Sequence, residues 1–70
     1  MEKSLKVLTE LIENQKKTLL SVATRIVPNV TEDDLLQPND FPILENHPEF
    51  RYEEGVLHGF LATYAALQIN

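Results

Sequence analysis

Residues 49 to 68 are expected to form a helix that is apolar on two sides. On a helical wheel of ~100° per residue, the large side chains occupy one broad arc. This arc consists of Phe50, Val56, Leu57, Phe60, Leu61, Tyr64 and Leu67. A stripe of small residues lies on nearly the opposite side and consists of Gly55, Gly59, Ala62 and Ala66. Because a helix with two apolar sides needs a neighbour on each, a second copy of this short chain is the expected second neighbour.

The small-residue stripe has two interpretations. Small side chains let another backbone approach closely, as in helix contacts built on glycine. Alternatively, Ala62 and Ala66 are good helix formers on an exposed surface. The glycines favour the contact, because each costs about 1 kcal/mol relative to alanine inside a helix. The sequence therefore predicts an interface at the stripe.

The size of the chain also favours self-association. Its 70 residues are expected to form a single domain, residues 1–70, and a domain this small buries only about 60% of the surface of its unfolded chain. There is no cysteine to supply disulfides or thiolate ligands for zinc. No stretch resembles a signal peptide or a membrane span. We therefore expect a soluble, cytoplasmic homodimer that does not contact membranes.

The first half of the chain predicts a long amphipathic helix over residues 3–27. Leu5, Ile12, Leu19 and Ile26 recur every seven residues. Leu8, Gln15 and Val22 alternate with them, and Leu11 and Ala23 widen the apolar arc to that of a helix in a bundle. A buried Gln15 amide must find hydrogen-bond partners. In a symmetric dimer it is expected to meet its own copy and to fix the register.

The connection over residues 28–47 is too long for a featureless loop. Pro28 is expected to end the first helix, and Thr31 followed by three acids predicts an N-cap and a short helix at about residues 32–36. Residues 37–40 have the composition of a turn, and Pro48 suits the first position of the second helix. Three apolar residues of the connection are expected to cover one end of the bundle: Phe41, Ile43 and Leu44.

Charge is divided unevenly along the chain. Residues 1–27 carry five basic and three acidic side chains, whereas residues 28–70 carry one basic and eight acidic side chains. In an antiparallel hairpin, Arg25 is expected near Glu49 or Glu53. Alternatively, the acidic stretch of residues 32–54 recognises a basic protein partner. The candidate contacts for such a partner are Asp34, Asp40, Phe41 and Glu45.

Glu54 and His58 are weak candidates for metal binding or proton transfer, because they stand four residues apart on one helix, with His47 nearby in sequence. Di-iron bundles instead use a Glu-x-x-His spacing, and Gly55 occupies the position three before His58. A surface ion pair or hydrogen bond is the simpler interpretation. With no catalytic constellation in view, we expect no enzyme activity and no cofactor.

A nucleic-acid partner is disfavoured by the net charge of −5. The two glycines both fall inside the second helix, so there is no phosphate-binding loop. A helical hairpin that binds nucleic acid nevertheless stays as an alternative, as does a metal-binding bundle.

Together, these patterns predict an all-α protein. The expected architecture is an antiparallel two-helix hairpin, with helices at about residues 3–27 and 49–68, that dimerises into a four-helix bundle. The expected function is that of a small interaction or regulatory module.

Overall fold

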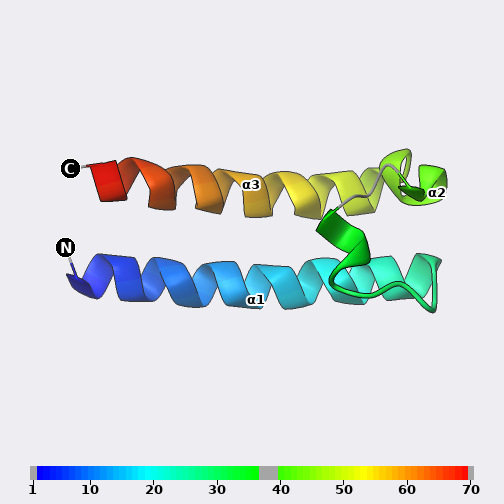
Figure 1. Cartoon of the computed structure of the whole chain (residues 1–70), viewed down its shortest axis with the longest axis horizontal. Coiled ribbons are helices and arrows are strands. Elements are labelled where there is room, and N and C mark those ends of the chain that lie inside the picture. The colour runs from blue at the N-terminus through cyan, green and yellow to red at the C-terminus, as the bar shows by residue number, and fades with distance from the viewer. Residues whose placement is uncertain (1, 37–39, 70) are drawn as a thin grey trace.

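The computed structural model describes residues 2–36 and 40–69. The chain forms α1 (Glu2–Ile26), the short 3-10 helix η1 (Asp34–Leu36), α2 (Pro42–Glu45) and α3 (Pro48–Ile69), and these ranges contain no strand. The two long helices lie side by side and antiparallel, and the connection joins them at one end (Figure 1). We call this the closed end, and the opposite end, where both termini lie, the open end. The predicted all-helical hairpin is confirmed.

α1 forms where the heptad pattern predicts it. The buried residues of its seam are Leu8, Ile12, Leu19, Val22 and Ala23, which pack against α3. Beyond the last residue of the helix, the Val27 amide still donates to the Ala23 carbonyl at 2.7 Å. Leu11, at the edge of the apolar arc, is 44% exposed in the hairpin, so its predicted place in the wider arc of a bundle stays a prediction.

α3 begins at Pro48, as predicted, and packs on α1 through the arc of large side chains. Phe50 is fully buried and Leu57 is buried, while Phe60, Tyr64 and Leu67 pack against them from partly buried positions. Leu61 lies outside this contact and is 40% exposed. Near the closed end, Nη2 of Arg25 lies 2.7 Å from Oε2 of Glu49, which confirms the predicted pairing.

A turn in the connection is stabilised by reciprocal hydrogen bonds between Thr31 and Asp34, in which each side chain accepts a bond from the backbone amide of the other residue. The Thr31 amide donates to the Asp34 carboxylate at 2.9 Å, and the Asp34 amide donates to the Thr31 hydroxyl at 3.3 Å. This reciprocal pattern is that of a capping box, so the predicted N-cap at Thr31 is confirmed. The predicted helix at 32–36 is a single 3-10 turn, with Leu35 packed against the core.

α2 is a one-turn helix that the sequence pattern does not predict. Its Leu44 is fully buried, and Phe41 before it is partly buried against the core. Ile43 is 59% exposed, so it does not cover the end of the hairpin, and its predicted role in a bundle stays a prediction. In one helical turn, two adjacent residues point in different directions, and only Leu44 reaches the core. Most of the turn predicted at 37–40 lies outside the described residues.

Candidate interaction surfaces

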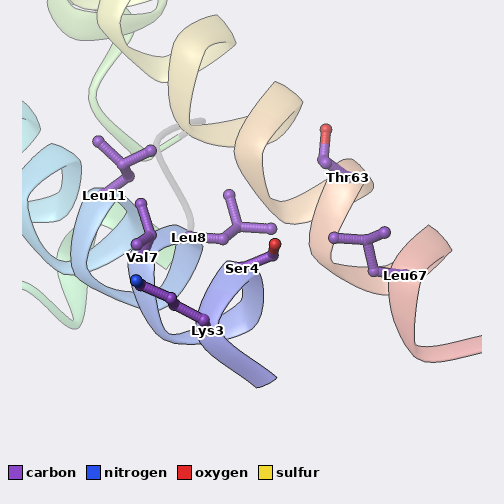
Figure 2. A pocket seen from close by; sticks show the side chains of 7 residues that line it. All are labelled: Lys3, Ser4, Val7, Leu8, Leu11, Thr63 and Leu67. Carbon is purple, nitrogen blue, oxygen red and sulfur yellow. The ribbon is translucent and has the colours of Figure 1, made fainter. Parts of the chain in front are cut away.

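An apolar groove lies between α1 and α3 near the open end. It has a volume of about 500 Å³ and is lined by Lys3, Ser4, Val7, Leu8, Leu11, Thr63 and Leu67. Leu8 and Leu67 extend toward each other across it (Figure 2). Val7 and Leu11 form its outer side and are 51% and 44% exposed. Large apolar side chains gathered in one open groove are typical of an interaction surface rather than of a chain's own core.

Val7 is a residue of this groove that the heptad pattern does not reveal. It lies outside the seam of α1, where a single exposed valine has no special meaning. The sequence feature that could have identified Val7 is its spacing of four residues from Leu11, which places both residues on the same flank of the helix. The importance of this flank is evident only in the folded chain, where α3 leaves the side chains of Val7 and Leu11 exposed.

The small-residue stripe lies on the exposed side of α3. Gly55, Gly59, Ala62 and Ala66 are all exposed, so the predicted stripe faces away from α1. Apart from the adjacent residues and the nearby backbone of α3 itself, a methyl group added at either glycine would meet no atom of the described residues within 4 Å. The glycines are therefore not required by packing within the hairpin, and the predicted interface at the stripe stays a prediction.

Gln15 is half-buried between the two long helices, where it bonds to α3. Its Nε2 donates to the Glu53 backbone carbonyl at 3.0 Å and to Oε1 of the same residue at 2.8 Å. The side-chain amide group thus links the helices within one chain. The predicted contact between Gln15 and its own copy stays a prediction. The NH₂ group that would donate to the second copy already donates to Glu53 within the same chain.

We expect Gln15→Ala to lower the free energy of unfolding by about 1 kcal/mol, because it removes a hydrogen bond to a carboxylate in a half-buried position. A double-mutant cycle with Glu53→Ala, followed by urea denaturation, measures the coupling between the two residues. If the effects of the two substitutions on the free energy of unfolding are additive, the side-chain bond between Gln15 and Glu53 does not contribute to stability.

The four candidate partner contacts of the connection occupy different environments. Asp34 caps Thr31, and Phe41 packs against the core, so both serve the fold. Asp40 and Glu45 are exposed. The structure therefore separates two structural residues from two acids that are accessible to a partner, and recognition of a partner by any of the four stays a prediction.

A second groove, of about 800 Å³, lies between α1, α3 and the connection. Charged and polar side chains on its walls are Lys16, Glu32, Asp33, Arg51, Glu54 and His58. Glu54 is 8% exposed, and its Oε1 lies 3.0 Å from Nη1 of Arg51. The charge of this buried carboxylate is thus balanced by a neighbour one turn away on the same helix.

The metal candidates do not form a ligand cluster in the described part of the chain. Glu54 and His58 line the same groove, but Glu54 is paired with Arg51. Residues 2–36 and 40–69 contain no group of three or more acidic or histidine side chains arranged to hold a metal ion. The Nδ1 atom of His47 is buried without a hydrogen-bond partner in these ranges. Metal binding by Glu54, His58 or His47 stays a prediction.

The fold and these surfaces define a two-helix hairpin with an apolar groove at its open end and a charged groove beside its connection. No protein-family model matches the sequence, and the comparisons with curated proteins and with solved structures found no match either. Neither long helix, within the residues described, is sufficiently long and apolar to cross a membrane.

Proposed function

We propose that this protein is a small, non-enzymatic interaction module that functions as a homodimer of helical hairpins. The observation that carries the proposal is the open apolar groove, in which Val7 and Leu11 are left exposed. A homodimer would cover this surface in a four-helix bundle, the usual arrangement for paired helical hairpins.

The exposed area of the hairpin supports this proposal. Its solvent-accessible surface is 5034 Å². A compact monomer of 8.0 kDa is expected to expose about 4,450 Å² from the scaling of surface with mass. An exposed area above the expected value is consistent with two helices that each have one neighbour and share one contact strip. In a bundle of four, each helix has two neighbours and exposes less area. Pairing of two hairpins would therefore bring the area per chain closer to that of a compact protein.

The proposal includes a cytoplasmic location and the absence of a cofactor, a nucleic-acid partner and a membrane partner. The net charge of −5 disfavours contact with polyanions. Regulation of another protein would act through surfaces that the dimer leaves free, among them the exposed acids Asp40 and Glu45.

Sedimentation equilibrium tests the homodimer directly. We expect a species of twice the 8.0 kDa chain mass at micromolar concentration. A monomer that is folded by circular dichroism and stays monomeric throughout this concentration range would contradict the proposal.

Gly59→Leu tests the small-residue stripe. Since the position is open within the hairpin, leucine is expected to fit and to raise the intrinsic stability of α3 by up to about 1 kcal/mol. In the dimer, the added side chain is expected to separate the two copies and to weaken association by about tenfold or more.

Ala65→Leu is the matched control, because Ala65 is also exposed on α3 but lies outside the stripe. Sedimentation of both variants gives the comparison. Equal association of Gly59→Leu and the parent chain would show that the stripe faces water.

A further inference from the structure

The charged groove beside the connection has an apolar floor built from three elements. Figure 1 shows η1 between α1 and α3, and each of these elements contributes to the lining of the groove. Four leucines take part: Leu19 of α1, Leu35 of η1, and Leu57 and Leu61 of α3. Leu19 and Leu57 are buried, whereas Leu61 is 40% exposed. An apolar side chain from outside the molecule can therefore reach this floor at Leu61.

The lysine and the arginine on the walls of the groove are paired within the chain. Nη1 of Arg51 lies 3.0 Å from Oε1 of Glu54, and Nζ of Lys16 lies 3.6 Å from Oε1 of Glu13. Each pair joins residues three apart on one helix, so it forms without another element of the fold. The two positive charges of the walls are thus balanced by neighbours on their own helices.

The acids of the connection carry the unbalanced charge of the groove. Glu32 and Asp33 line it, both are exposed, and neither takes part in an ion pair within residues 2–36 and 40–69. Their charge adds to the excess in residues 28–70, which carry eight acidic side chains and one basic side chain. A cationic side chain is therefore attracted to this rim, and an anionic one is repelled.

We propose that the charged groove binds a segment of another protein in which an apolar side chain is flanked by lysine or arginine. The apolar side chain contacts Leu61 on the floor, and the basic side chains lie against Glu32 and Asp33 on the rim. An apolar centre with charged groups at its margin is the usual anatomy of a protein interface. This inference rests on the proposed role as an interaction module, specifies the chemistry of the partner, and does not depend on the homodimer.

The exposure of the groove favours a protein segment over a small molecule. Sites for small molecules enclose about 70–90% or more of the ligand surface. Here, Glu32, Asp33 and Leu61 are all exposed, so the groups that would recognise a ligand lie at an open surface. A nucleic acid is disfavoured by the same acids. A segment that extends past the groove and keeps its basic groups in contact with water fits this arrangement.

Selection from a library of random peptides displayed on phage tests the chemistry of the partner, with the intact chain as the target. Peptides of about twelve residues span ~40 Å when extended, which matches the 39 Å length of the hairpin. We expect the enriched peptides to combine a large apolar residue with lysine or arginine. Enrichment of acidic peptides, of apolar peptides without basic residues, or of no peptide at all would overturn the proposal.

Binding of one enriched peptide, made synthetically and followed by fluorescence anisotropy, locates the acids that attract it. Glu32→Gln combined with Asp33→Asn is expected to weaken binding by about fivefold or more at low salt, because it removes both rim charges. Asp40→Asn combined with Glu45→Gln is the matched control. It removes the same charge from exposed acids that do not line the groove, so binding should stay within about twofold. Equal weakening in both variants would mean that the peptide responds to overall charge and not to the groove.

Leu61→Ser tests the apolar floor. We expect it to weaken peptide binding by at least about tenfold, because apolar anchors at the centre of an interface carry much of the binding energy. Leu11→Ser is the matched control, since Leu11 is 44% exposed but lines the groove at the open end. Circular dichroism should show that both variants remain helical. Loss of binding in Leu11→Ser but not in Leu61→Ser would overturn the assignment to the charged groove.

The outcomes separate this inference from the homodimer. The charged groove borders the small-residue stripe at Gly55, so sedimentation and peptide binding are measured on the same samples. A monomeric parent chain that binds the basic peptide would overturn the homodimer and keep this inference. A dimer that selects no basic peptide would keep the homodimer and overturn this inference.

Discussion

Phe50→Ala is expected to lower the free energy of unfolding by about 3–5 kcal/mol, because it empties a fully buried position at the start of α3. At ~0.05–0.15 kcal/mol per residue, a chain of this length has a total stability of about 4–10 kcal/mol. The variant should therefore be partly or wholly unfolded at room temperature. Urea denaturation monitored by circular dichroism at 222 nm measures the change.

Phe50→Leu provides the comparison within the same site. Leucine retains most of the apolar volume, so this variant is expected to remain folded. Its urea denaturation midpoint should lie between those of the parent chain and Phe50→Ala. Equal midpoints for all three chains would mean that Phe50 does not anchor the core.

Leu44→Ala is expected to cost about 2–5 kcal/mol, because Leu44 is fully buried and connects α2 to both long helices. The neighbouring Ile43 is 59% exposed, so Ile43→Ala should change stability by less than about 0.5 kcal/mol. Thermal melts of the two variants measure the contrast. A similar loss in both would indicate that α2 packs differently from the arrangement described above.

The two long helices follow from the sequence because their periodicity is local. The seven-residue spacing from Leu5 to Ile26 and the stop at Pro28 place the first helix to within a residue of α1. The second helix begins at Pro48 for the same kind of reason, since proline suits the first helical position. The Arg25–Glu49 pair then follows from antiparallel packing alone.

The side chains at the edges of each apolar arc do not follow from periodicity. Leu11 and Leu61 belong to apolar arcs, but one neighbouring helix covers only a narrow strip, and both lie beyond it. α2 is equally unpredictable, because its single turn has no period to detect, and Leu44 is buried by long-range contacts.

The candidate surfaces were accessible to sequence reasoning only in part. The glycine and alanine stripe is readable because glycine has an intrinsic cost in a helix that calls for an explanation. Val7 has no such signal. Its meaning depends on which flank of α1 is left uncovered by α3, and this is a property of the folded chain.

The two glycines also govern how α3 forms. Gly55 and Gly59 give the middle of this helix its lowest intrinsic helical stability, by about 1 kcal/mol per glycine relative to alanine. Leu57 and Phe60 from the same stretch pack in or against the core and hold it helical. Because isolated helices of this kind are marginal in water, α3 depends on docking against α1 for its structure. Helix formation and closure of the hairpin are therefore one cooperative event rather than two.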